Sequence, residues 1–471
     1  MTIMFASKIS VSMLLAVQLS FMLIPETSSL VPSNQRHYAR NATLENPPNL
    51  PRNKTSTPTK NRSIQRPVSK HAPASDQHKS YIVLLNDQVI VLDFVSALQK
   101  SWKSGSGSSL SENRIGYVYK EMGFNGFSAQ LDDQAFKSLS RSAGVQEIIP
   151  DSLVSVNPID EVLSDALSTA GLGVEPAHNA TVHEQGIPDH YSQKGTAPWA
   201  FKDSTRDKRS PFVARTLGVI VYILDTGARE THNDFGGRVE MAAQFGGYDM
   251  DDGNGHGTHC AGIVAGNRWG VAKRAQVKAI KVLADDGSGS TSDVIAGVQY
   301  ALQQYRDAGY PPTVVSLSLG GEKNTALDRA VQAAISQGIH FVVAAGNSNT
   351  DACLASPAAV SGANVVSASD IKDNRASYAS WGTCVDFFAP GTDITSAWFT
   401  ADDATKRMSG TSMATPHVAG LIAAHLSRQN YTTQQMSDKL KRDATRDAIY
   451  LGPVDSDPSS TPNLLLYNSI Q

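Results

Sequence analysis

From about residue 198 onward, apolar segments typical of buried strands alternate with segments whose apolar residues recur at helical spacing. Because largely apolar strands joined by helices form parallel sheets with both faces covered, residues 196–471 are expected to fold as one α/β domain. The predicted strands are 217–224, 277–283, 314–319, 340–345 and 365–368, and the predicted helices are 258–265, 292–308, 326–337 and 412–426.

A smaller folded region is predicted before it, at residues 80–156. Residues 81–85, 124–129 and 145–149 have the pattern of strands, and 91–99 and 133–142 the pattern of helices. Two β-α-β halves of this size predict a small α+β domain of the ferredoxin-like kind. Residues 157–195 lose this periodicity and are predicted to be a linker.

The N-terminal residues 1–29 have the layout of a secretory signal peptide, with Lys8 before an apolar run at 9–24 and small residues after it. An uncleaved membrane anchor is the alternative, but the run is short and interrupted by polar residues. No other segment has 18 uninterrupted apolar residues. We therefore expect a secreted, extracellular protein with no membrane partner.

Residues 30–79 are rich in Pro, Ser, Thr and Asn and lack apolar periodicity. Nine Lys/Arg and two acids lie between Arg36 and Lys79, which fits either an arm that binds polyanions or, as we prefer, a disordered, glycosylated spacer. The net charge of −3 for the whole chain gives no basic footprint for nucleic acid. N-glycosylation sequons begin at Asn41, Asn53, Asn61, Asn179 and Asn430.

Ser412 lies where a turn of small residues runs directly into an apolar helix, within 409–420. Free backbone N–H groups and the helix dipole at such a position favour developing negative charge. Ser412 is therefore a candidate nucleophile, provided that a base and an orienting acid exist elsewhere in the chain.

Asp225 is the candidate acid, since it follows the apolar run 218–224 and precedes Thr226 and Gly227. A carboxylate at the carboxyl end of a buried strand lies where open α/β sheets place their ligands. A turn aspartate, which is common after strands, is the alternative. An aspartic protease also uses Asp-Thr-Gly, but it needs a second such motif for its carboxylate dyad, and the sequence has none.

His256 is the candidate base, in the glycine-dense segment 252–262. Imidazole titrates near neutral pH, as a general base requires. His256 and His259 are alternatively a pair of metal ligands, although no Glu-assisted zinc pattern and no third ligand is evident.

The order Asp, His, Ser differs from that of the chymotrypsin and α/β-hydrolase classes. With Asp-Thr-Gly at 225, His-Gly-Thr-His-Cys-Ala-Gly at 256 and Gly-Thr-Ser-Met-Ala-Thr-Pro-His-Val-Ala-Gly at 410, residues 197–468 resemble the subtilase family of serine endopeptidases, and most of all its proteinase K-like branch. The resemblance implies that Asp225 orients His256 and that His256 takes the proton of Ser412. It also implies that Asn347 donates to the oxyanion; without the resemblance Asn347 reads as an ordinary turn residue.

The resemblance further places an extended substrate strand between two edge segments, one at 283–289 and the other at 318–320. The wall of the pocket is small and uncharged, so we expect broad cleavage of proteins and peptides after aliphatic or aromatic residues. An enzyme selective for basic residues is disfavoured, because His259 stands where those relatives carry Arg. The predicted substrate-binding residues are Gly287, Ser288, Gly289, Ser318, Leu319, Gly320, Ala344, Ala345 and Gly346.

The three cysteines are an odd number, which in a secreted protein indicates one disulfide and one free thiol. Resemblance to aqualysin-like relatives implies a Cys353–Cys384 bond and leaves Cys260 unpaired beside His256. The resemblance also implies a structural calcium ion, held by the backbone oxygens of Ser361 and Ala363 and by the Asp386 carboxylate. No cofactor is expected for the chemistry.

Residues 80–156 resemble the inhibitor-type propeptide of subtilases, through 81–83 and 124–129. Such a domain docks on the enzyme as an intramolecular inhibitor and leaves its C-terminal tail in the active site. The expected product is a monomeric zymogen that cleaves itself near 154–160 or near 188–195. The competing interpretations are a binding protein built on an inactive protease scaffold and a metallopeptidase.

Overall fold

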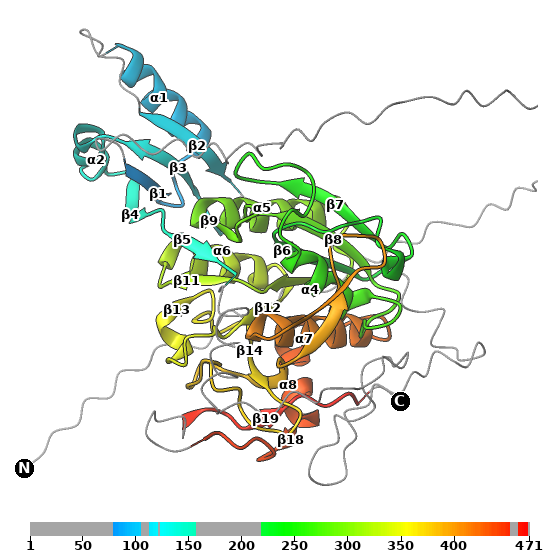
Figure 1. Cartoon of the computed structure of the whole chain (residues 1–471). Helices are drawn as coiled ribbons and strands as arrows, with labels where there is room; N and C mark the ends of the chain where they lie inside the picture. Colours follow the sequence, from blue (N-terminus) through cyan, green and yellow to red (C-terminus); the bar gives the residue numbers. More distant parts are fainter. Residues whose placement is uncertain (1–78, 105–112, 121–122, 157–217, 453–459, 470–471) are drawn as a thin grey trace, which may run out of the picture. The chain divides into compact units, whose positions relative to one another are not determined.

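The computed structural model describes residues 79–104, 113–120, 123–156, 218–452 and 460–469 (Figure 1). The predicted signal peptide, the linker at 157–195 and all but the last residue of the spacer lie outside this part of the chain. Among the sequons, only Asn430 lies within it, and its side chain is exposed. In the described residues, no helix has the length and apolar character that crossing a lipid bilayer requires.

The N-terminal described region is a small α+β domain with a four-stranded antiparallel sheet in the order β2-β3-β1-β4. Side chains such as Val83 on the central strand and Phe127 on its neighbour form its buried core. This confirms the predicted pair of β-α-β halves. The elements are β1 (Lys79–Leu85), α1 (Val91–Ser104), β2 (Arg114–Tyr119), β3 (Gly126–Leu131), α2 (Asp133–Leu139) and β4 (Val145–Pro150).

Strand β2 has no counterpart among the predicted strands, and its local geometry explains why. Gly116 interrupts the strand pattern, and the pairing with β3 is irregular between Ile115 and Val118. A Cβ at position 116 would lie 2.5 Å from Oγ of Ser128, so the glycine allows the two strands to approach. The bulge removes the two-residue periodicity on which the prediction depended.

The larger region is built on a nine-stranded sheet in the order β18-β19-β15-β14-β12-β10-β6-β8-β7. Neighbouring strands are parallel except β18 and β19, which confirms the predicted parallel sheet. The strands are β6 (Ile220–Asp225), β7 (Val239–Gln244), β8 (Gln276–Lys281), β10 (Thr313–Leu317), β12 (His340–Ala344), β14 (Asn364–Ser369), β15 (Phe387–Pro390), β18 (Thr445–Arg446) and β19 (Leu464–Leu465).

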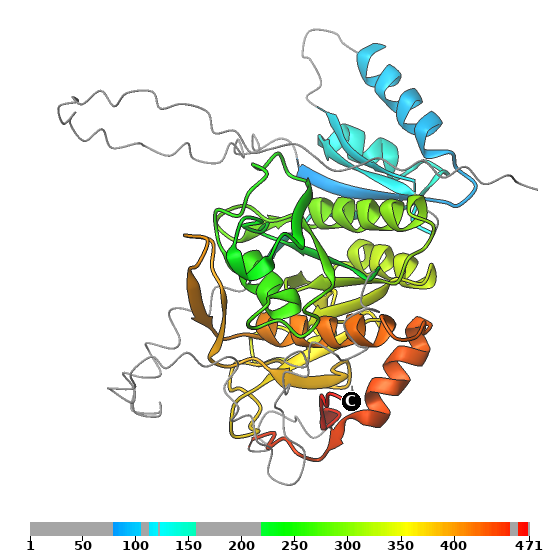
Figure 2. The ribbon, with the colours of Figure 1, turned by 90° about the vertical axis from the view of Figure 1, so that its right-hand side faces the viewer.

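Helices cover both faces of this sheet because successive strand residues point to opposite sides. On β6, Val221 and Ile223 pack with the cluster that contains α4, α7 and α8, whereas Tyr222 and Leu224 pack with the cluster that contains α5 and α6. In Figure 2 the long helices α5, α6 and α7 run nearly parallel to one another. The helices are α4 (His256–Ala265), α5 (Thr291–Asp307), α6 (Thr325–Ser336), α7 (Thr411–Leu426) and α8 (Thr433–Asp443).

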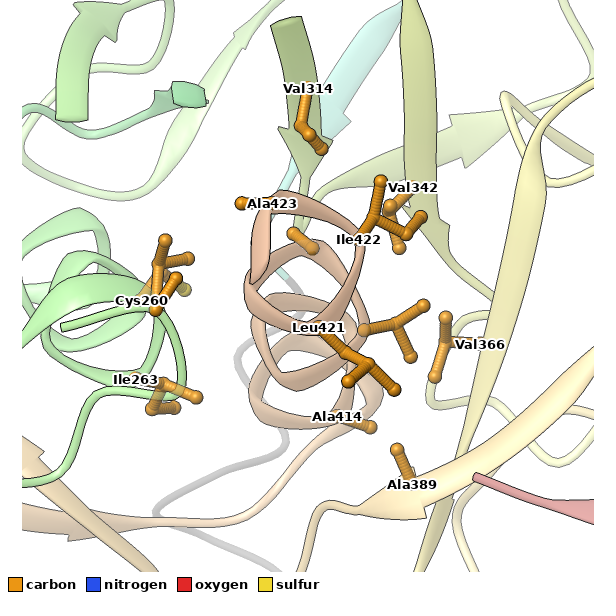
Figure 3. Close-up of a cluster of buried hydrophobic side chains, with 14 of the residues drawn as sticks. Cys260, Ile263, Val314, Val342, Val366, Ala389, Ala414, Leu421, Ile422 and Ala423 are labelled. Atoms are coloured by element: carbon orange, nitrogen blue, oxygen red, sulfur yellow. The ribbon is translucent and has the colours of Figure 1, made fainter. Parts of the chain in front are cut away.

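Helix α7 is buried along its whole length. Figure 3 shows it between α4, which contributes Cys260 and Ile263, and the sheet strands that contribute Val342 and Val366. A helix that is apolar on all sides needs such an enclosed position. Its packing fixes the N-terminal turn that carries Ser412.

A second four-stranded sheet brings the two regions together, in the order β13-β11-β5-β9. Its strand β5 belongs to the N-terminal region and pairs antiparallel with β9 on one side and β11 on the other. Three residues carry no strand signal of their own, so this strand was not predicted. The strands are β5 (Leu153–Ser155), β9 (Ser288–Ser290), β11 (Gly320–Glu322) and β13 (Ala355–Ser356), and the remaining pair is the hairpin of β16 (Ile394–Ala397) and β17 (Thr405–Met408).

The cysteines pair as predicted. Cys353, in the 3₁₀ turn η4 (Ala352–Leu354), forms a disulfide with Cys384, and their Cα atoms are 5.4 Å apart. Cys260 is a buried free thiol in α4. The other short turn, η3 (Asn233–Phe235), lies between β6 and β7.

Candidate active site

Asp225 is the last residue of β6 and is fully buried. Its Oδ1 accepts a hydrogen bond from the backbone N–H of Thr226 at 2.7 Å and lies 2.8 Å from Nδ1 of His256. The backbone bond fixes the carboxylate, and the carboxylate in turn fixes the ring. Of the four predicted catalytic residues, Asp225 and His256 are therefore in direct contact.

His256 is the first residue of α4, and the turn before it depends on glycine. Gly255 has φ 104°, a conformation that L-residues with side chains rarely adopt. A Cβ there would also collide with the rings of Trp398 and Phe399, at 2.7 and 2.5 Å. The side chain of His256 is buried, and its Nε2 has no hydrogen-bond partner. With Nδ1 donating to Asp225, Nε2 is left as a proton acceptor.

The charge of Asp225 shapes the titration of His256. Burial alone lowers the pKa of His256, because an imidazolium loses its hydration, but the nearby carboxylate outweighs this and holds the pKa of His256 above its ordinary value. Burial raises the pKa of the Cys260 thiol, which therefore stays protonated. The site thus stabilises an imidazolium at position 256.

Ser412 is the second residue of α7, and a proline one turn later changes its surroundings. Pro416 has no N–H, so the carbonyl oxygen of Ser412 lacks its usual helical donor four residues ahead. It accepts instead from Oγ of Ser318 at 2.8 Å and lies 3.5 Å from Sγ of Cys260. The position of Pro416 in the sequence is the signal that could have predicted this extra acceptor.

The link between Ser412 and His256 is indirect in this structure. Oγ of Ser412 donates to the backbone oxygen of Ser318 at 3.2 Å. Cys260 lies between the two residues, with Sγ 3.9 Å from Nδ1 of His256 and 3.5 Å from the carbonyl oxygen of Ser412. The His256 ring and the backbone of Ser412 therefore share one buried neighbour, but no hydrogen bond joins Oγ of Ser412 to Nε2 of His256.

Asn347 lies beside the N-terminus of α7. Its Oδ1 accepts from the N–H of Thr411 at 2.8 Å and from Oγ1 of Thr411 at 2.9 Å. These bonds fix the orientation of the amide and leave Nδ2 as a free-standing donor group. Asn347 and Ser412 line the same cavity, so the structure brings this predicted residue to the site.

That cavity has a volume of about 240 Å³ and adjoins the N-terminus of α7. Its lining contains six of the nine predicted substrate-binding residues, and one carboxylate, Asp351, whose Oδ1 accepts from the N–H of Cys353. Ser155 of β5 lines it too. The six residues are Ser318, Leu319, Gly320, Ala344, Ala345 and Gly346.

The other three predicted binding residues, Gly287, Ser288 and Gly289, lie along the opposite side of β5. Ser155 pairs with both Ser288 and Gly320, and the N–H of Val156 donates to the oxygen of Gly287 at 3.0 Å. The two predicted edge segments therefore enclose an extended strand. The occupant is the tail of the N-terminal domain itself.

Hydrogen bonds to two helix N-termini hold this tail in place. The carboxylate of Asp151 accepts from the N–H and the Oγ of Ser292, on the first turn of α5, at 2.9 and 2.7 Å. Nδ2 of Asn324, the N-cap of α6, donates to the oxygen of Pro150 at 3.1 Å. Nothing in the sequence of the tail had marked Asp151, since its partners lie on a distant helix.

His259 does not form a metal pair with His256. Its Nε2 lies 3.0 Å from the carbonyl oxygens of both Ile394 and Lys406, so this nitrogen must carry a proton and donate. Burial lowers the pKa of His259 to about 3. His259 is a neutral structural residue.

The predicted calcium ligands do not fit a calcium ion. Oδ1 of Asp386 lies 2.6 Å from Nζ of Lys441, and Oδ2 accepts from the N–H of Val365 at 2.9 Å. Both oxygens of the only predicted carboxylate ligand are therefore engaged by the protein. Burial raises the pKa of Asp386, while Lys441 and the Val365 N–H oppose that effect. Ser361 and Ala363 lie just before β14, whose residue Val365 contacts Asp386, but they contribute no further charge.

Comparison with known families separates the same two regions. A family model described as "Subtilase family" matches residues 216–460, and one described as "Peptidase inhibitor I9" matches residues 69–157. The first match contains Asp225, His256, Asn347 and Ser412. The second ends just after β5.

Similar individual proteins agree with these matches. The chain is 40% identical to the subtilisin-like proteinase Spm1 of Pyricularia oryzae over 74% of this chain and 65% of that protein. It is 46% identical to cerevisin of Saccharomyces cerevisiae over 53% of this chain and 42% of that protein, so it spans less than two thirds of either relative. A crystal structure of a cold adapted subtilisin-like serine proteinase is similar with a TM-score of 0.50 and 44% identity, over 55% of this chain and 91% of that one.

Proposed function

The chain belongs to the subtilase family, and on that premise we propose that it is a serine endopeptidase in which Asp225, His256 and Ser412 act as the catalytic triad. The observation that carries the proposal is the pairing of Asp225 with Nδ1 of His256 at 2.8 Å, with Nε2 left unpartnered. A buried imidazole with one nitrogen fixed and the other open is the arrangement that a general base needs.

Proton transfer follows from this geometry. Oγ of Ser412 turns from the oxygen of Ser318 toward Nε2 of His256, transfers its proton and attacks the peptide carbonyl. Asp225 stabilises the resulting imidazolium. That proton then passes to the leaving nitrogen as the carbon–nitrogen bond breaks, and water releases the acyl group by the same steps.

The negative charge on the carbonyl oxygen would be met by two donors. One is the backbone N–H of Ser412 at the start of α7, where helix N–H groups are unpaired. The other is Nδ2 of Asn347, whose amide Thr411 holds in orientation. Donors that are fixed in advance need no rearrangement when the charge develops.

We infer broad specificity for aliphatic or aromatic side chains from the cavity beside Ser412. Ala344, Ala345 and Gly346 give it small, uncharged walls, and its volume of about 240 Å³ suits a side chain of that size. Peptide-library cleavage should therefore show Leu, Phe or Tyr before the cut bond. A dominant preference for Lys or Arg would instead assign a binding role to Asp351.

The N-terminal domain is proposed to keep the enzyme inactive as a zymogen until its tail is cut and released. Support comes from β5, which fills the cleft between β9 and β11 and runs toward Ser318 and Ser412. The direction of β5 favours the first of the two predicted cleavage ranges, 154–160. N-terminal sequencing of the processed product distinguishes it from 188–195.

Secretion is proposed from the sequence and the disulfide, and a monomeric state from the sequence alone. The layout of residues 1–29 and the disulfide support an oxidising compartment. Recovery of the processed protein from the culture medium as a monomer would agree with this, whereas retention in cells with residues 1–29 uncut would contradict it.

The activity itself is tested by casein hydrolysis with the full chain and its Ser412→Ala variant. We expect hydrolysis by the parent chain that chelators do not block, and in Ser412→Ala both loss of hydrolysis and accumulation of uncut precursor. Hydrolysis that a chelator abolishes, or that survives in Ser412→Ala, would favour a metallopeptidase. A folded, processed parent without hydrolysis would favour a binding protein on an inactive scaffold.

A further inference from the structure

Asp386 lies at the amino end of the parallel strands of the large sheet, whereas the candidate active site lies at their carboxyl end. It directly precedes β15, whereas Asp225 ends β6, and the strands of this sheet are parallel. Its side chain is only 18% exposed, and its backbone N–H donates to the oxygen of Val365. The disulfide at Cys384, two residues earlier, further fixes the segment.

The cation beside it comes from a helix whose position is also fixed. Lys441 lies in the last turn of α8, and Met436 and Leu440 anchor this helix in the core. A capping box between Thr432 and Gln435 defines its start. Lys441 can therefore present its ammonium to Asp386 without ordering a loop.

We propose that Lys441 is a built-in cation that takes the place of calcium at Asp386. Its Nζ lies 2.6 Å from Oδ1, which is within the distance range of calcium–oxygen bonds. An ammonium and a calcium ion at the same oxygen would repel each other, because both are positively charged. Calcium also needs six to eight oxygen ligands, and here the one carboxylate is already neutralised.

The same geometry implies that removing the ammonium would expose a latent cation site. The side chain of Lys441 is 41% exposed, so a shorter neutral residue is tolerated there. Lys441 also lines a cavity of about 760 Å³ together with Ser361 and Gly362, so solvent reaches the position of the ammonium. Without Lys441, the partly buried Asp386 carboxylate would have no counter-ion and would favour binding one.

The test measures the thermal midpoint Tm of the full chain in a Ser412→Ala background, which prevents self-digestion. Tm is recorded in millimolar calcium chloride and in EGTA for the parent, for Lys441→Gln and for each combined with Asp386→Asn. Lys439→Gln is the matched control, since Lys439 lies on the same helix but pairs with Asp443. Isothermal titration with calcium provides a direct second measurement of binding.

We expect the parent and Lys439→Gln to show no Asp386-dependent calcium shift in Tm. Lys441→Gln should lose about 2–4 °C in EGTA, recover most of it in calcium, and lose that recovery when Asp386→Asn is added. A parent that gains several degrees from calcium, with the gain abolished by Asp386→Asn, would overturn the proposal. So would a Lys441→Gln variant with neither a lower Tm in EGTA nor any Asp386-dependent binding of calcium.

Discussion

Two carboxylates at opposite ends of the parallel strands of one sheet have different partners. Asp225, at the carboxyl end of β6, contacts an imidazole at 2.8 Å. Asp386, just before β15, contacts an ammonium at 2.6 Å. The imidazole has a second ring nitrogen that can accept a proton, whereas the ammonium group has donors only.

The two sites also differ in whether the basic side chain keeps a polar atom free for a further contact. Nε2 of His256 has no hydrogen-bond partner, so it can accept a proton. Lys441 has a single polar group, its ammonium, and this group already contacts Asp386. We therefore propose that one acid–base pair serves catalysis at one end of the sheet and that the other stabilises the fold at the opposite end.

Asp225→Asn gives the largest predicted effect. The variant should lose about 10⁴-fold in kcat, because the amide no longer holds His256 in the required tautomer. Since Asp225 raises the pKa of His256, the acid limb of the residual kcat/KM profile should also move to lower pH. Asp386→Asn should leave kcat within about twofold and lower Tm instead. Equal losses of kcat in the two variants would mean that the two ends of the sheet do not differ in their contribution to catalysis.

Asn347→Ala tests the proposed side-chain donor to the oxyanion. Loss of the Nδ2 donor should lower kcat by about 10²–10³-fold, with little change in KM, because the interaction forms only in the transition state. Steady-state kinetics with a peptide substrate gives both constants. A rise in KM at unchanged kcat would show that Asn347 binds substrate rather than the oxyanion.

Removing the disulfide tests the proposed stabilising role of the end of the sheet that carries Asp386. In a variant with Cys353→Ser and Cys384→Ser, the free energy of unfolding should fall by about 3–4 kcal/mol, given a sequence separation of 31 residues. The value of kcat measured well below Tm should not change. Denaturant unfolding measures the free energy of unfolding, and kinetics on the same preparation measures kcat. A large loss of kcat would show that the end of the sheet near Asp386 affects catalysis as well as stability.

Buried histidines provide the last prediction, which is the smallest when counted for one histidine over one pH unit and should not distinguish the two ends of the sheet. Burial lowers the pKa of His259 to about 3 and that of His340, His417 and His425 to about 4. Each stays neutral when folded but binds a proton when unfolded, so its stabilising contribution is complete above the unfolded pKa near 6.5 and is lost as pH falls toward 4. The loss is about 1.4 kcal/mol per pH unit for each histidine.

Chemical denaturation of the Ser412→Ala chain between pH 7 and pH 4 measures that loss. His340→Gln should make the pH dependence shallower by about one histidine's share. A dependence that is as steep in His340→Gln as in the parent would mean that this histidine is protonated in the folded protein.

The sequence predicted the strands β14, β12, β10, β6 and β8, the helices α4 to α7 and the acid–base pair because their signals are local. Strands β7, β15, β18 and β19 and helix α8 were not predicted. Glycine before His256, small residues before Ser412 and an apolar run before Asp225 each report their own surroundings. The bulge at Gly116 and the short strand β5 were missed, since both exist only through pairing with distant segments. Lys441 was missed for the same reason: its partner, Asp386, lies 55 positions away and was assigned to calcium by resemblance.

The most direct test of the triad is the site of covalent labelling by a fluorophosphonate, mapped by mass spectrometry on the processed protein. The account predicts one adduct, on Ser412, that is lost in His256→Ala while Lys441→Gln still labels. An adduct on another residue, or labelling of Ser412 at an undiminished rate in His256→Ala, would contradict it.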